Sequence, residues 1–258
     1  MKRIRINQVD TFTSKPMAGN PAGVVSNAAG LTDDEMHAIA REINLPATTF
    51  VFPPNDTKAN FLVRYFTPCG EIAVGGHPTL ATIHVLLEEG KIGRDCKQVW
   101  LETGGGILPI DISSADDGKY TITITMTTPK FESAAISHDT LAAMLGTDPG
   151  NLENYPICKM YTGLYYYVVG LKSLSAIKGL CPDFAAIAEL SRKNWISGLQ
   201  IFTTETDDPN CDFHVRTFLP VQGTNEDIVC GTGNSCIGAF VVENGIYKTD
   251  GYRILAAE

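Results

Sequence analysis

The 258-residue sequence has no long run of lysine and arginine, and its 29 acidic residues outnumber its 20 basic ones, giving a formal net charge of −9. Proteins that bind nucleic acid or anionic membranes non-specifically carry basic patches. The composition therefore argues against both partners. No stretch approaches the ~20 apolar residues needed to span a bilayer. "MKRIRINQVDTFT" has early basic residues but no apolar segment behind them, so we expect no secretory signal.

The sequence also lacks the usual cofactor signatures. Its seven cysteines form no CxxC pair and no cysteine–histidine cluster with zinc spacing. Their odd number favours a reduced, cytoplasmic protein. Glycines cluster in "TGGGI" and "CGTGNSCIGA", but neither segment fits the GxGxxG motif or the P-loop with its lysine. We therefore expect neither a metal nor a nucleotide cofactor.

What is present is the pattern of a mixed α/β protein. The segments "ATTFVF" and "NFLVRYF" are rich in β-branched and aromatic residues and predict strands. "TDDEMHAIAREI" predicts a helix with Thr32 as its N-cap, and two apolar helices are expected to stop at Gly90 and Gly245. "SKPMAGNPAG" and residues 128–140 predict loops. We place two domains at residues 1–128 and 129–258.

The two halves contain a repeat. Phe61, Arg64, Phe66 and Pro68 match Phe213, Arg216, Phe218 and Pro220 at a constant spacing of 152 residues. Beyond the turn the spacing becomes 155 residues, so that Glu71 matches Glu226, Gly76 matches Gly231 and Gly90 matches Gly245. Convergence explains any single match, because Phe, Arg and Gly are common at strand ends and turns. A register held over both segments favours two domains that arose by duplication.

The repeat suggests a position for the site. A helix that opens at a glycine corner leaves backbone N–H groups unpaired, and such groups attract anions. One corner lies around Gly76, and the other comprises Gly231, Thr232 and Gly233. We expect the two helix starts to face each other across a cleft between the domains and to bind one small carboxylate.

Several motifs resemble those of the PhzF-type phenazine-biosynthesis family, within the diaminopimelate epimerase-like superfamily. They are "QVDTF", "AGNPAGVV", "NLPATTFV", "RYFTPCGEIAVGGHPTLA" and "EDIVCGTGN", in that order along nearly the whole chain. The resemblance implies two similar α/β domains, each a barrel-like sheet around a central helix, with the active site between them. It also implies an isomerase or epimerase that needs no cofactor. Dimers are common among these relatives, so a homodimer is one assembly that the chain could form.

The resemblance assigns roles to individual residues. It implies proton-handling roles for His77 and Asp227 and a site hydroxyl at Thr232. The glutamate that acts as general acid and base in the family falls on Ala47, which cannot carry a proton. The natural protein then does different chemistry, has lost activity, or has been altered at this residue. The family also continues past the strand that "GYRILAAE" is expected to begin, so the chain could be truncated there.

Other candidates stay open. Cys230 occupies the place of a proton-transferring thiol in related racemases, and a helix start lowers the pKa of a thiol; alternatively it is a small structural residue. Its counterpart in the first half is Gly75, which makes a two-thiol racemase improbable. Glu71 and Glu226 are interpreted as structural braces of the helix ends. Asn20 either binds substrate through its amide or shapes its loop.

The sequence therefore predicts a cofactor-free isomerase or epimerase that moves a proton on a small carboxylic acid. The alternative is a catalytically inactive protein that binds a small acid on the same scaffold. The loss of the family glutamate at Ala47 favours the alternative, whereas the retention of His77, Asp227 and both glycine corners favours the enzyme.

Overall fold

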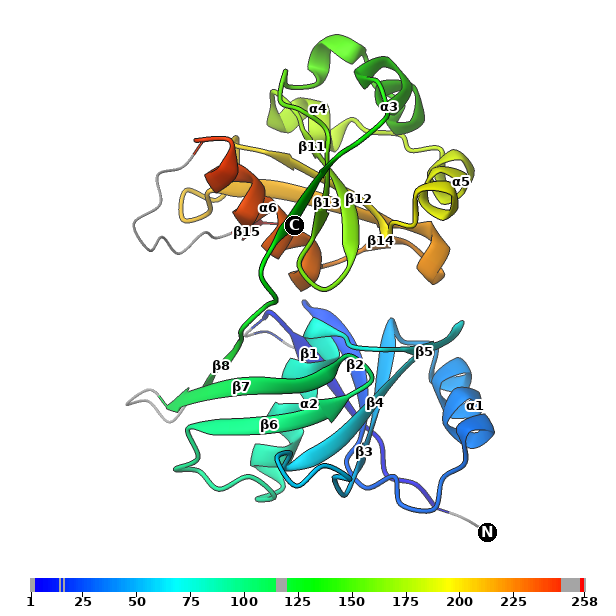
Figure 1. Cartoon of the computed structure of the whole chain (residues 1–258), viewed down its shortest axis with the longest axis vertical. Helices are drawn as coiled ribbons and strands as arrows, with labels where there is room; N and C mark the ends of the chain where they lie inside the picture. The colour runs from blue at the N-terminus through cyan, green and yellow to red at the C-terminus, as the bar shows by residue number, and fades with distance from the viewer. Residues whose placement is uncertain (1–2, 14, 16, 115–119, 247–255, 258) are drawn as a thin grey trace. The chain divides into compact units, whose positions relative to one another are not determined.

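The computed structural model describes residues 3–13, 15, 17–114, 120–246 and 256–257. The chain divides into two compact units, Met1–Thr125 and Met126–Glu258. The domain boundary expected after residue 128 lies close to this division. Each unit is a mixed sheet that curls around one helix (Figure 1).

The first unit contains eight strands and two helices. They are β1 (Asn7–Thr11), β2 (Asn20–Val25), α1 (Asp33–Ile43), β3 (Ala47–Phe52), β4 (Phe61–Thr67), β5 (Gly70–Ile72), α2 (Gly76–Glu88), β6 (Gln98–Thr103), β7 (Gly106–Ser114) and β8 (Tyr120–Ile124). The strand order is β1-β2-β3-β4-β6-β7-β8, with β5 paired to β4.

The second unit follows a similar plan. Its elements are β9 (Lys130–Ser133), α3 (His138–Leu145), the 3₁₀ turn η1 (Pro149–Asn151), β10 (Cys158–Tyr161), β11 (Tyr165–Gly170), α4 (Leu174–Lys178), α5 (Phe184–Asn194), β12 (Gly198–Thr203), β13 (Phe213–Leu219), η2 (Pro220–Gln222), β14 (Thr224–Asp227), α6 (Gly231–Glu243) and β15 (Ala256–Ala257). The strand order is β14-β13-β12-β11-β10-β9, with β15 parallel to β13.

Three strand pairings, among four consecutive strands, recur in the two units. β2 pairs in parallel with β3, β3 pairs antiparallel with β4, and β4 pairs antiparallel with β5. β11 likewise runs parallel to β12, and β13 and β14 add in antiparallel fashion. The strands that carry the sequence repeat, β4 and β13, occupy equivalent places. The repeat is therefore a repeat of topology.

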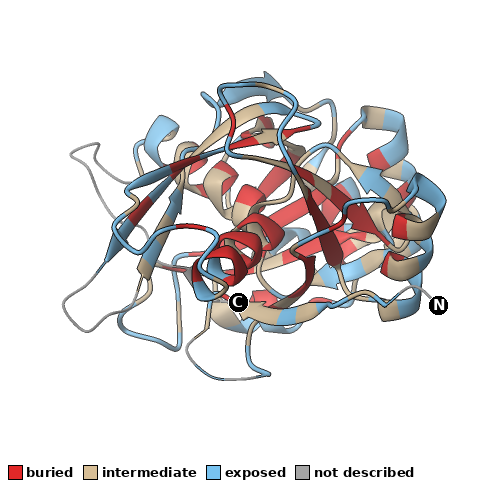
Figure 2. Cartoon of the chain, turned by 90° about the horizontal axis from the view of Figure 1, so that it is seen from below, coloured by how far each residue is buried: buried red, intermediate tan, exposed pale blue. Residues whose placement is uncertain are grey.

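Both faces of each sheet are apolar. One face packs against the enclosed helix, and the opposite face packs against the outer helices. In the first unit, α2 packs Ile83 and Leu86 against the strands, and α1 packs Met36 against the opposite face. In the second unit, α6 contributes Phe240 to one core, and α3, α4 and α5 cover the other. Figure 2 shows buried residues along the strands and enclosed helices, with exposed residues on the outer loops.

Most predicted elements are present, and three local predictions were wrong. The expected loop "SKPMAGNPAG" gives way at Asn20 to strand β2. The connector at residues 128–140 contains β9, and α3 begins at His138. The alternation of residues from Arg3 to Phe12 also predicts a strand over that whole segment, but the strand begins only at Asn7. Thr32 caps α1 as predicted, in a capping box with Glu35. Most of the segment expected to begin a further strand at the end of the chain lies outside the described residues.

Candidate active site

The two enclosed helices begin without a capping side chain. The N-cap residues of α2 and α6 are Gly75 and Cys230, and neither makes a side-chain capping hydrogen bond. The outer α-helices of the described chain all take a side-chain cap, from Thr32, Ser137, Ser173 and Asp183. The first amides of α2 therefore have no capping side chain that accepts from them, which leaves a helix start suited to an anion, whereas in the first turn of α6 the Gly233 amide hydrogen-bonds the Cys230 thiol.

His77 is the second residue of α2, and its ring is fixed in one orientation. Its hydrogen bond goes to the backbone carbonyl of Pro21, and its Nε2 is buried with no partner among the described residues. Since Pro21 offers only an acceptor, Nδ1 must carry the proton. Nε2 then holds a lone pair.

The pKa of His77 is lowered to about 4, chiefly because burial disfavours the charged imidazolium, with the Pro21 hydrogen bond opposing the shift. The position of His77 at a helix start by itself also predicts a neutral imidazole, because the helix field disfavours a cation there. Burial is the larger cause. The side chain is therefore a neutral proton acceptor at ordinary pH.

Asn20 and Ala47 lie close to Pro21, the residue that binds this histidine, in the strand network. Asn20 begins β2, is fully buried, and accepts a hydrogen bond from Thr11 Oγ1 on its carbonyl at 3.0 Å. Ala47 begins β3 and pairs with Ala22, the residue after Pro21. Ala47 is itself buried, so the position of the family glutamate holds a methyl group close to the strand that orients His77.

The second unit orients its helix start in an analogous way. Thr232 is the second residue of α6, as His77 is of α2. Its hydroxyl lies 2.8 Å from the hydroxyl of Tyr166, on β11. β11 is the counterpart of β2, because Tyr166 pairs with Gly198 of β12 as Ala22 pairs with Ala47 of β3. Each unit thus fixes the second residue of its enclosed helix from the equivalent strand.

Cys230 does not have the lowered thiol pKa expected from its place at a helix start. Its pKa is raised to about 12, first because the thiol is buried and second because the charge of Asp227 lies nearby. Its Sγ lies 3.4 Å from the Tyr166 hydroxyl and 3.6 Å from the Thr232 hydroxyl. Burial outweighs the helix field, so the thiol stays protonated and belongs to the packing beneath α6.

A polar relay, which the sequence did not reveal, supports the start of α6. Thr217 Oγ1 donates to Gln200 Oε1 at 2.6 Å, and Gln200 Nε2 donates to Asn234 Oδ1 at 2.9 Å. A side-chain carbon on Gly233 would collide with Gln200, so this glycine is required for close approach. Gly233 therefore serves the packing of the site.

The first unit replaces this relay with a direct contact. Tyr65 and Thr79 are the counterparts of Thr217 and Asn234, and their hydroxyls lie 2.7 Å apart. Thr79 Oγ1 also donates to the carbonyl of Gly75 at 2.7 Å. No sequence signal links these residues, because their strands and helices meet only in the fold.

The acidic residues next to the helix starts have separate roles. Glu71 and Glu226 each bind the arginine of the preceding strand, Arg64 or Arg216, through two hydrogen bonds, as the brace interpretation predicts. Asp227 follows Glu226 at the end of β14, pairs in register with Thr217 and is half-buried.

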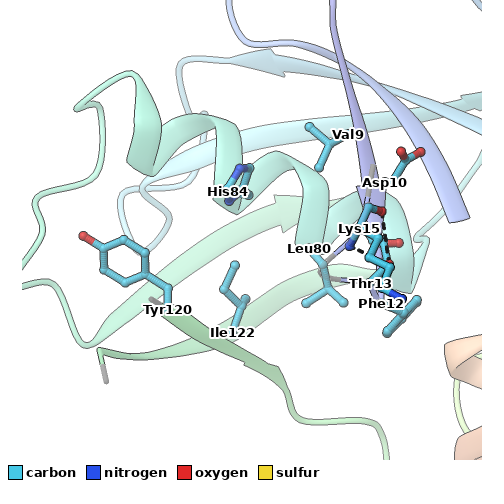
Figure 3. Close-up of a pocket in the computed structure, with 10 residues that line it drawn as sticks. Val9, Asp10, Phe12, Thr13, Lys15, Leu80, His84, Tyr120 and Ile122 are labelled. Carbon is cyan, nitrogen blue, oxygen red and sulfur yellow. Dashed lines mark hydrogen bonds between the residues drawn. The ribbon is translucent and has the colours of Figure 1, made fainter. Parts of the chain in front are cut away.

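A hollow of about 520 Å³ lies along α2 beyond His77. Figure 3 shows the side chains that line it, including Leu80 and His84 from α2, Val9 from β1 and Ile122 from β8. It occupies the gap between the two edge strands of the first sheet. His77 is not among its lining residues, so this cavity adjoins the helix start without containing it.

The described residues include no group of three or more His, Cys, Asp or Glu side chains arranged to hold a metal ion. Among them, no helix is long and apolar enough to cross a membrane.

Two curled sheets, each around one helix, match the diaminopimelate epimerase-like fold. Within that class, residues 9–256 match the family described as phenazine biosynthesis-like protein (PhzC–PhzF), and the chain belongs to this family. An uncharacterized isomerase of Clostridium acetobutylicum is 34% identical over 260 residues, covering 96% of this chain and 84% of the relative.

Solved structures agree with this assignment. The Bacillus anthracis phenazine biosynthesis protein of the PhzF family has a TM-score of 0.86 at 32% identity, covering 98% of this chain and 83% of that one. A hydroxyproline epimerase from Agrobacterium vitis has a TM-score of 0.61 at 18% identity, covering 93% and 78%. The second likeness concerns the fold alone. Several relatives, including those of Clostridium acetobutylicum and Bacillus subtilis, are named uncharacterized isomerases.

Proposed function

We propose that this chain is a cofactor-independent isomerase or epimerase that moves a proton on a small carboxylic acid. The observation that carries the proposal is the lone pair of His77 Nε2, which is buried beside the uncapped start of α2 with no partner among the residues that the structure describes. A carboxylate at the amides of Gly76 and His77 would lie within reach of this nitrogen.

His77 is the proposed proton acceptor. Because its pKa is about 4, the ring is neutral at pH 7 and can accept a proton only where the product imidazolium is stabilised. The charge of a bound carboxylate supplies that stabilisation and raises the pKa of the ring. Positioned proton transfer of this kind contributes roughly 10²–10⁴-fold in rate.

The second unit would contribute the other half of the site. Gly231 and Thr232 would present amides to the substrate, and Asp227 would exchange the second proton. Support comes from the glycine-opened start of α6 and from the Tyr166 contact, which orients Thr232. Cys230 takes no part in proton transfer here, because its thiol stays protonated.

A second function is favoured by one specific observation. Ala47 places a buried methyl group where the family has its catalytic glutamate. A protein that binds a small acid without turning it over would keep the anion site and lose this group. The two functions differ only in whether protons exchange.

The test is deuterium incorporation from D₂O into a panel of small amino, hydroxy and unsaturated carboxylic acids, read by mass spectrometry. The chain itself, Ala47→Glu and His77→Asn are compared, with binding measured by calorimetry. Exchange by the chain that His77→Asn abolishes supports the enzyme. Exchange only in Ala47→Glu identifies a disabled enzyme. Binding without exchange in all three proteins establishes the binder, and absence of binding to every acid refutes both functions.

A further inference from the structure

A second hollow, of about 570 Å³, lies wholly within the second unit, and we call it the Trp195 pocket. Its walls include Tyr161 and Tyr165 from the β10–β11 hairpin and Ser191, Arg192 and Trp195 from the end of α5. This volume lies within the roughly 300–1,000 Å³ of small-molecule sites. None of the residues proposed for proton transfer lines it.

Trp195 occupies a backbone position that does not favour tryptophan. It is the C-cap of α5, with a left-handed φ of 54°. The equivalent C-cap of α1 is Asn44, with a φ of 53°. Asparagine tolerates this conformation well, whereas a bulky residue there is strained. The backbone thus gives no reason for tryptophan at this position.

Burial gives no reason for it either, because Trp195 is 85% exposed. Large exposed aromatic residues beside a hollow are typical of binding sites. The remaining explanation for an indole at this cap is contact with a molecule that enters the pocket.

The walls of the pocket combine aromatic rings with one polar anchor. The rings of Tyr161 and Tyr165 have centroids 4.8 Å apart. Ser191 is fully buried, and its Oγ has no hydrogen-bond partner among the described residues. Rings of this kind suit a planar apolar group, and the hydroxyl can donate to an acceptor on it.

The charges around the pocket favour an anionic ligand over a cationic one. Lys130 and Lys159 lie 5.2 Å and 4.5 Å from the ring centroids of Tyr161 and Tyr165. Arg192 is exposed and makes no ion pair with any residue that the structure describes. Glu132 pairs with Lys159 at 3.5 Å and also hydrogen-bonds the Tyr165 hydroxyl, and none of the described residues that line the hollow carries a carboxylate. The two tyrosine rings already contact these lysines, so they are poorly placed to form an aromatic cage around a cationic ligand.

We propose that the Trp195 pocket binds a small planar aromatic carboxylate. The ring of the ligand stacks on Trp195, and its carboxylate binds Arg192. This site lies beyond the proposed function and does not depend on it.

The experiment uses the full chain and benzoate as the probe. The chain has two tryptophans, so Trp100→Phe leaves Trp195 as the only indole and its fluorescence as the reporter. Benzoate should give a saturable change in that emission. Benzamide, its neutral isostere, should bind at least about tenfold more weakly because it cannot form the charge-assisted bond.

Calorimetry on single variants then locates the site. Trp195→Asn introduces the residue that the first unit uses at this cap, so the backbone is preserved, and Arg192→Gln removes the cation. Each should weaken benzoate binding by about tenfold or more. Arg41→Gln, at the equivalent place on α1, is the matched control and should leave it unchanged.

Three results would overturn the proposal. They are the absence of a saturable response to benzoate, full binding by Trp195→Asn, and equal binding of benzamide and benzoate. Sedimentation of the chain and of Trp195→Asn provides a further test. A dimer that dissociates in the variant would show that the surface is a subunit contact, which also contradicts a ligand pocket.

Discussion

Arg216 binds Glu226 through two parallel hydrogen bonds, of 2.6 Å from Nε and 2.8 Å from Nη2. Arg64 binds Glu71 in the same geometry, at 2.7 Å and 2.6 Å. Each arginine also reaches a flanking helix. Arg64 contacts Asp33 at the start of α1, and Arg216 donates to the carbonyl of Ile177 in α4. One side chain therefore ties the strand, the turn and the outer helix together in both units.

Arg216→Met should lower the free energy of unfolding by about 1–2 kcal/mol, because bidentate charge-assisted bonds and the carbonyl contact of a largely sheltered side chain are lost. Denaturant unfolding measures the change. Lys178→Met is the control, since Lys178 and Asp207 form a pair that is largely exposed to solvent. Its effect should stay below about 0.5 kcal/mol. Equal effects of the two substitutions would contradict the bracing role.

His77 makes stability depend on pH. Its pKa is near 6.5 in the unfolded chain and about 4 in the fold, so the unfolded state binds more protons between these values. The contribution of His77 to the free energy of unfolding is therefore fully present above pH 6.5 and is lost as the pH falls toward 4. Between pH 7 and pH 5 the chain should lose about 2 kcal/mol more than His77→Asn. Parallel pH profiles of the two proteins would show that the imidazole titrates normally.

The cysteines should separate into two classes on alkylation. Cys69 and Cys181 are exposed, whereas Cys230 and Cys236 are buried with pKa values raised to about 12 and about 11. Iodoacetamide at pH 8 should modify the exposed pair in the native protein and the buried pair only after unfolding, because the thiolate is the nucleophile. Peptide mass mapping checks this. Native labelling of Cys230 at the rate of Cys69 would restore it as a candidate acid or base.

Two glycines near the helix starts should respond differently to alanine. At Gly233 a methyl group collides with Gln200 and disrupts the relay to Thr217 and Asn234, which should cost about 1–3 kcal/mol in the free energy of unfolding. At Gly76 a methyl group meets no neighbour within 4 Å, so stability should be retained. Thermal unfolding compares the variants. Carboxylate binding by Gly76→Ala should still weaken, because the methyl group restricts approach to the amide.

The repeat in the sequence predicted the equivalence of β4 and β13, because strand, turn and glycine corner follow each other locally. It could not reveal Tyr166 or Gln200, whose partners lie on a helix far along the chain. The strand at Asn20 was missed because proline and glycine in "NPAG" are typical of loops, whereas β2 is held by strands on both sides. The raised pKa of Cys230 was also not predicted. The sequence shows that this residue lies at a helix start, which lowers a thiol pKa, but it does not show that the thiol is buried.

The contrast between capped outer helices and uncapped enclosed ones has a consequence for how the fold can evolve. The outer helices are anchored by their own first residues, and the enclosed helices by their apolar cores. The first turn of α2 thus contributes little to the stability of the fold. Substitutions at Gly76 and His77 can redirect chemistry while the scaffold persists, which makes this turn the place where new specificities would arise.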